Sequence, residues 1–148
     1  MFTDQQIKEI AGELQCGMKC FIEKATNKII IAFDWDDPYF DEGALPEEAI
    51  QELEDLRTNL MAYHEIEKMP SNKGFGVMED FVDAMSNTRD YRLKMQLIQA
   101  LNKRKPFANF KHIVENSNHR EAWFAFRDEA ARNWVKKQLS RITQKEGE

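Results

Sequence analysis

The residues best suited to chemistry lie between Lys103 and Arg127, where basic and aromatic side chains are interleaved. The cations of this stretch are the candidate binding residues, namely Lys103, Arg104, Lys105, Lys111, Arg120 and Arg127. Cations neutralise phosphates and release counterions, and exposed aromatic rings stack on unpaired bases. The composition of this stretch is therefore typical of a surface that binds RNA or single-stranded DNA.

The aromatic rings of the same stretch have a second interpretation. Phe107 and Phe110 are three residues apart, as are Trp123 and Phe126, and this is the spacing of core side chains on one helix face. We favour this interpretation, in which the rings turn inward and leave a cationic exterior. A pI near 5.3 also argues against a dedicated nucleic-acid-binding protein. For the Lys103–Lys105 run, a plain solvated turn is favoured, and a binding site is the alternative.

Metal binding is the second chemistry to consider. The aspartates that begin at Asp34 resemble the start of a calcium-binding loop, which needs a glycine at its sixth position and a glutamate at its twelfth. Tyr39 and Leu45 occupy these two positions, so the geometry fails. A solvated acidic loop over 34–42 is favoured, and a weak cation site is the alternative. No two of the three histidines have the helical spacing used by zinc enzymes.

Catalysis has the least support from the sequence. Cys16 and Cys20 match no common zinc or redox motif, so we expect buried structural thiols. There is no nucleophile elbow and no complete phosphate-binding glycine loop. We predict no catalytic residue, no metal ligand and no cofactor. An enzyme would need a cleft that gathers Asp36, Asp37 or Glu79 beside a basic residue.

Composition and charge predict the domain organisation of the chain and the distribution of charge along it. The chain has 148 residues, 42% hydrophobic and 11% aromatic, which predicts a single globular domain over 1–148. Residues 1–85 carry 7 Lys+Arg against 19 Asp+Glu, whereas residues 86–148 carry 14 against 7. We therefore expect an acidic α/β half (about 1–85), a basic helical half (about 86–142) and a polar tail (143–148). Such polarity prompts a search for an ionic partner, within the chain or outside it, but the favoured interpretation is that acidic and basic elements pack together and neutralise each other.

Two classes of environment are not expected. No apolar run is longer than five residues, the length of Ile29–Phe33, which is far short of the roughly 20 residues that cross a membrane. The first residues have neither the basic nor the apolar region of an export signal, so a reducing cytoplasm is the predicted location.

Residue periodicity predicts an α+β fold. An N-terminal helix and a β-hairpin, with a possible third strand, are followed by a mainly helical C-terminal half. Ser71 is the expected cap of the helix over 73–86. The predicted elements are a helix over 4–16, a hairpin over 18–33, a helix over 46–60, a weak strand over 63–68, and helices over 73–86, 91–101, 107–114 and about 123–142.

Several blocks of the chain resemble one known family. They are Lys105–Lys111, Arg120–Arg127, Trp134-Val135, Met69-Pro70-Ser71 with Phe75, Met78-Glu79 and Phe81, and Cys20-Phe21-Ile22 before Thr26-Asn27. Together they resemble a bacterial uncharacterised protein family of the UPF series, number one-five-eight, over about 18–137. The family often has arginines where Ala108 and Asn109 stand here, which weakens any anion site on that helix. The resemblance implies a fold and a cytoplasmic setting but no mechanism.

The hypothesis that best fits these observations is a non-enzymatic macromolecular-interaction module. Its acidic and basic faces would engage each other, join two copies of the chain, or meet a protein partner that the sequence does not identify. The first alternative is an RNA- or DNA-associated protein that uses the basic face around 103–127. The second alternative is an enzyme of unknown type.

Overall fold

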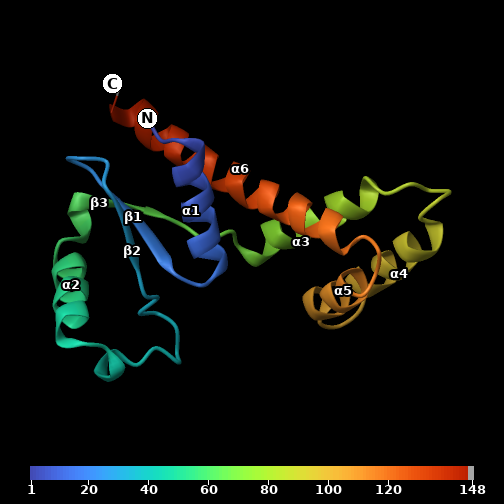
Figure 1. Ribbon diagram of the computed structural model, residues 1–148, viewed down its shortest axis with the longest axis horizontal. Helices are drawn as coiled ribbons and strands as arrows, with labels where there is room; N and C mark the ends of the chain where they lie inside the picture. The colour runs from blue at the N-terminus through green and yellow to red at the C-terminus, as the bar shows by residue number, and fades with distance from the viewer. Residues whose placement is uncertain (147–148) are drawn as a thin grey trace. The chain divides into compact units, whose positions relative to one another are not determined.

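The computed structural model describes the backbone of residues 1–146 and the side chains of residues 1–143 (Figure 1). The chain forms two compact units: unit 1 comprises Met1–Lys68 and Arg132–Glu148, and unit 2 comprises Met69–Ala131. An N-terminal helix, an antiparallel three-stranded sheet and a mainly helical remainder confirm the predicted α+β class. The single-domain organisation over 1–148 stays a prediction.

The helices and strands follow the predicted order closely. Their bounds are α1 Asp4–Gln15, β1 Lys19–Glu23, β2 Ile29–Ala32, η1 Glu42–Ala44, α2 Glu47–Thr58, η2 Leu60–Ala62, β3 Tyr63–Ile66, α3 Ser71–Asp83, α4 Tyr91–Leu101, α5 Pro106–Glu115 and α6 Arg120–Glu146. Ser71 is the first residue of α3 and not its cap, because Pro70 occupies the N-cap position. Helix α6 extends into the predicted polar tail, of which 147–148 lie outside the described residues.

The sheet of unit 1 has the strand order β2-β1-β3, with both pairings antiparallel. The predicted hairpin is present, and its turn contains Asn27 in the left-handed conformation at φ 59°. The weak third strand predicted over 63–68 is also present, as β3. Central strand β1 places Phe21 opposite Ile30 on one side and Glu65 on the other.

Both faces of β1 are covered, because its three middle residues are almost fully buried. Cys20 lies close to Glu13 of α1, so this face of the sheet packs against α1. Phe21 points the other way and stacks on Trp35 with 5.6 Å between ring centroids, and Arg57 of α2 lies over the same indole. Figure 1 accordingly shows α1 and α2 on opposite sides of the sheet.

The C-terminal part of α6 is anchored to the residue that follows β3. The Gln138 side chain accepts a hydrogen bond from the Glu67 N–H (2.8 Å) and donates one to the Glu67 carbonyl (3.0 Å). The Trp134 indole N–H donates to the same carbonyl at 2.9 Å. These bonds satisfy the backbone of an edge segment, and they lie beside the buried residues that α6 contributes to unit 1, namely Val135, Leu139 and Ile142.

Unit 2 is a helical assembly with an aromatic core. Phe110 of α5 and Trp123 of α6 meet edge to face at 4.9 Å, and Phe81 of α3 lies 5.3 Å from Trp123. Phe110 is 0% exposed and Trp123 is 4% exposed, so these two rings turn inward as expected. Phe126 is half-buried against Phe81. The expectation is wrong for Phe107, which is 40% exposed.

None of the helices described within residues 1–146 is both long enough and apolar enough to cross a membrane.

The aromatic core predicts a large effect of Trp123→Ala. Removing a buried indole leaves a cavity, so we expect the free energy of unfolding to fall by about 3–5 kcal/mol, measured by urea denaturation. Phe107→Ala is the matched control, because this ring is partly exposed and should cost clearly less. An unchanged midpoint for Trp123→Ala would contradict the buried placement of the indole.

Candidate interaction surface

The Lys103–Lys105 run forms the turn between α4 and α5, two helices that pack against each other. Lys105 is the N-cap of α5 and has the left-handed conformation, with φ 53° and ψ 55°. The Asn109 side chain donates a hydrogen bond to the Arg104 carbonyl at 2.8 Å, and its N–H donates to the Lys105 carbonyl at 3.1 Å. Asn109 therefore stabilises the turn from inside the helix that follows it.

The three cations of this turn are exposed. Within the part of the chain whose side chains are described, neither they nor Lys111 form an ion pair. The turn also lies at the N-terminus of α5, where unpaired backbone N–H groups add positive potential, and the first turn of that helix has no acidic residue. We call Lys103, Arg104 and Lys105 the basic turn.

Phe107 and Lys111 continue the basic turn along one face of α5. They are four residues apart and therefore neighbours on the helix surface, and both are exposed. One edge of the Phe107 ring packs against α3 of the same unit. The ring lies edge to face with Phe75 at 6.4 Å, and a Cβ added at Gly74 would be 3.5 Å from it. One side of the ring is thus fixed while the other faces solvent.

Arg120 and Arg127 share one aromatic partner on α6. Their guanidinium carbons lie 5.2 and 4.8 Å from the centroid of the Phe124 ring, so both make cation–π contacts with it. Arg127 is half-buried and also pairs with Asp128 at 3.2 Å. The structure therefore divides the six predicted cations into two groups, and in the second group Arg127 already has an anionic partner.

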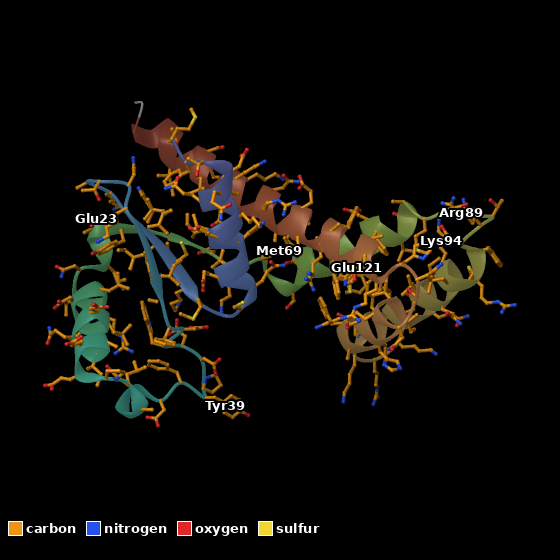
Figure 2. The ribbon with its side chains drawn as sticks, in the orientation of Figure 1. Glu23, Tyr39, Met69, Arg89, Lys94 and Glu121 are labelled. Carbon is orange, nitrogen blue, oxygen red and sulfur yellow. The ribbon has the colours of Figure 1, made fainter. Side chains whose placement is uncertain are left out.

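The acidic loop is organised by its own backbone. Asp34, Asp37 and Asp41 each accept a hydrogen bond from the N–H two residues later, at 2.8–3.1 Å. These are Asx turns, which explain why aspartates recur where no helix or strand forms. Tyr39, labelled in Figure 2, extends away from this loop and is 94% exposed. Among the described residues, no three His, Cys, Asp or Glu side chains converge on a possible metal position.

An ion-pair cluster around Lys19 is the feature that the sequence did not predict. The Lys19 ammonium lies 3.0 Å from Asp36, 3.2 Å from Glu65 and 3.8 Å from Asp34. It also lies 4.9 Å from the centre of the Trp35 ring. Lys68 joins the cluster through Asp34 at 3.0 Å. The alternation of β1 placed Lys19 on the same face as Phe21, and that was the only signal of this role.

The cluster shifts two pKa values in the directions that its geometry requires. Burial alone lowers the pKa of the Lys19 ammonium, but hydrogen bonds to Asp36 and Glu65 outweigh burial and raise it. The hydrogen bond from Lys68 lowers the pKa of Asp34, assisted by the backbone N–H of Asp36. Both shifts favour the charged forms, so the cluster links the acidic loop to β1 and to the end of β3.

The two cysteines and the carboxylates named as enzymatic candidates have separate locations. Cys20 is buried as expected, and burial raises its thiol pKa to about 12, whereas Cys16 is exposed, contrary to the expectation of two buried thiols. Asp36 lies beside the cation Lys19, but its side chain is 72% exposed. Glu79 is exposed on α3 and belongs to unit 2, whereas Asp36 belongs to unit 1.

The lowered pKa of Asp34 makes stability depend on pH. Because the folded pKa lies below the ordinary value, the charged carboxylate stabilises the fold at neutral pH, and this stabilisation is lost as the pH falls through the folded pKa. Asp34→Asn keeps the oxygen that accepts from Asp36 and removes the charge. We expect it to lower the free energy of unfolding by about 0.5–1 kcal/mol at pH 7 and by little below about pH 3.

Denaturation of wild-type protein and Asp34→Asn across this pH range tests the assignment. Asp37→Asn is the control, because Asp37 is exposed, forms no ion pair among the described side chains, and keeps its turn-forming oxygen when changed. Parallel pH profiles for wild type and Asp34→Asn would contradict the role given to the charge.

A comparison with known proteins finds one match. A family model described as "Uncharacterised protein family (UPF0158)" matches residues 6–144. No curated protein and no solved structure matches the chain. The match covers both units and all of the candidate surface, and the family description carries no activity.

Proposed function

The chain belongs to the uncharacterised protein family UPF0158, and we propose that it is a non-enzymatic interaction module that binds an acidic protein surface through its basic turn. The observation that carries this proposal is the exposure of Lys103, Arg104 and Lys105, three adjacent cations with no ion pair among the described side chains. Lys111 extends the surface along α5, whereas Arg120 contacts the Phe124 ring of α6.

Three properties of the turn support a binding role over a plain solvated turn. Its backbone is constrained by the Asn109 hydrogen bonds, so little conformational freedom is lost when a partner binds. The N-terminus of α5 adds to its positive potential. The chain as a whole is acidic, with net charge −5, so a local cationic site is distinct from its surroundings and orients an anionic partner.

Charge reversal tests this proposal directly. The variant Lys103→Glu/Arg104→Glu/Lys105→Glu should bind a fluorescent deca-glutamate peptide at least about tenfold more weakly than wild type, because attraction becomes repulsion. The matched control is Lys136→Glu/Lys137→Glu/Arg141→Glu, which reverses three exposed cations of α6 in unit 1. Binding is measured by anisotropy between about 50 and 200 mM salt, where the wild-type affinity should fall with salt.

Two outcomes would contradict the proposal. One is equal weakening of peptide binding by both triple variants, which would show that the peptide responds to the net charge of the protein and not to a particular site. The other is no binding of the peptide by wild-type protein at low salt.

A pull-down from native lysate that compares wild type with the basic-turn variant then identifies the class of partner, because nuclease treatment removes only partners held through nucleic acid.

One observation favours nucleic acid as a second candidate function. Phe107 lies two residues after the basic turn, is 40% exposed and shares a face with Lys111. An exposed ring flanked by cations is the arrangement by which proteins bind single strands, with the bases stacking on the ring. The neutral residues Ala108 and Asn109 reduce the number of cations on the same helix, which makes this candidate the second.

The Phe107 ring separates the two candidates. If single-stranded RNA is the partner, Phe107→Ala should weaken binding of a 20-nucleotide oligo(U) by about tenfold, since stacking contributes roughly 1–3 kcal/mol per base. Tyr91→Ala, which removes an exposed ring from α4, is the control and should change little. No binding of the RNA at micromolar protein and low salt would exclude this candidate and leave the acidic-protein partner.

We further propose a bacterial cytoplasm as the setting of this module and one domain as its organisation. Two free thiols, one of them exposed at Cys16, suit a reducing compartment, which supports the first part.

A further inference from the structure

Strand β2 lies at the edge of its sheet, and with the residue that follows it forms an apolar run of five residues, Ile29–Phe33. In the described residues it pairs only with β1. Edge strands normally carry a lysine, a proline or a bulge that discourages pairing with another strand. The run from Ile29 to Phe33 contains none of these residues, and its pairing with β1 is regular.

The hydrogen-bond pattern between β1 and β2 shows which backbone groups of β2 point away from β1, toward the edge of the sheet. The N–H of Glu23 donates to the carbonyl of Lys28 at 2.9 Å, so the backbone of Lys28 points toward β1. Inward and outward pointing residues alternate along an antiparallel strand. The backbone groups of Ile29, Ile31 and Phe33 therefore point to the free edge, which makes three residues available for a further antiparallel strand.

The side chains of the same residues form an unpaired apolar surface. Ile31 and Phe33 are two residues apart and so lie on one face of the strand, and they are 37% and 45% exposed. The ring of Phe33 has one aromatic neighbour, Phe40, at 6.2 Å. A strand added at this edge would cover Ile31 and Phe33 while it satisfied the outward-pointing backbone groups.

The charges at the two ends of β2 favour a second copy of the same strand as the partner at this edge. Exposed Lys24 and Lys28 precede β2, and neither forms an ion pair within the part of the chain whose side chains are described. Two exposed aspartates follow it, Asp36, which also pairs with Lys19 of its own chain, and Asp37, which forms no ion pair among the described side chains. When two identical strands pair antiparallel, the basic end of each meets the acidic end of the other, and opposite charges across a strand pair stabilise it. The strand is therefore complementary to itself.

We propose that two copies of this chain associate through β2, antiparallel and with the two-fold axis at Ile31. This register places Ile31 opposite Ile31 and Ile29 opposite Phe33 of the second copy, so the three outward-pointing residues form the hydrogen-bonded pairs. It also places Lys28 at the acidic end of the other strand, opposite Asp34, which already binds Lys68 and Lys19 of its own chain; exposed Asp37 forms no ion pair among the described side chains and supplies free charge at that end. The two three-stranded sheets then become one continuous sheet. The interface involves unit 1 alone and does not depend on the function of the basic turn in unit 2.

Sedimentation equilibrium of the full chain, from about 1 µM to 1 mM, tests the association. We expect a reversible dimer. Ile31→Lys places two like charges directly opposite each other and should raise the dimer dissociation constant by about tenfold or more. Met61→Lys is the matched control, because Met61 is 86% exposed in the same unit and lies outside β2, and it should leave the constant unchanged.

Cysteine cross-linking tests the register and does not depend on whether Ile31→Lys folds. In a Cys16→Ser background, Ile31→Cys should give a reducible dimer on mild oxidation, because hydrogen-bonded partners have Cα atoms about 5.5 Å apart, within reach of a disulfide. Ile29→Cys lies on the same edge, but its equivalent in the second copy is four positions away along the strand, roughly 13 Å, so it should not cross-link.

A chain that stays monomeric throughout the concentration range would overturn the proposal. A dimer that Ile31→Lys leaves intact, or equal cross-linking by Ile29→Cys and Ile31→Cys, would also overturn it. Dimerisation that is lost in the basic-turn triple variant and kept in Ile31→Lys would instead assign the contact to the charged faces.

Discussion

The contact between Phe110 and Trp123 sets the orientation of the helix that carries the candidate surface. Their rings meet at 4.9 Å in the core of unit 2, and Phe110 has no exposed surface. Since α5 has one buried stripe, through Phe110 and Val114, the residues on its other side must face solvent. The exposure of Lys111 follows from this packing, and so does the position of the turn that precedes the helix.

The two units use charge differently. In unit 1, acidic side chains bond to their own backbone in the Asx turns or surround Lys19. In unit 2, the cations of the basic turn have no such partners among the described side chains. Among the described side chains, the basic turn is thus a place where three adjacent exposed cations have no ion pair, although the chain as a whole is acidic.

The division of charge along the sequence differs from its division in the fold. The predicted boundary between acidic and basic halves fell near residue 85, whereas unit 1 also contains the C-terminal part of α6 from Arg132 onward. Unit 1 thus has 11 Lys+Arg against 18 Asp+Glu, and unit 2 has 10 against 8. Basic residues of α6 therefore belong to the acidic unit. The difference in charge between the two units is thus smaller than the difference between the two halves of the sequence.

The sequence by itself determined the order and type of the elements, because helical and strand periodicity are local properties of apolar residues. It identified the hairpin, the third strand and the inward direction of Phe110 and Trp123. Tertiary structure decided which cations have partners: Arg120 and Arg127 contact Phe124, whereas Lys103–Lys105 form no ion pair among the described side chains. It also placed Phe107 at the surface despite its core-like spacing, since spacing defines a helix face but not what covers it. The Lys19 cluster joins residues up to 46 positions apart, a separation over which periodicity carries no information.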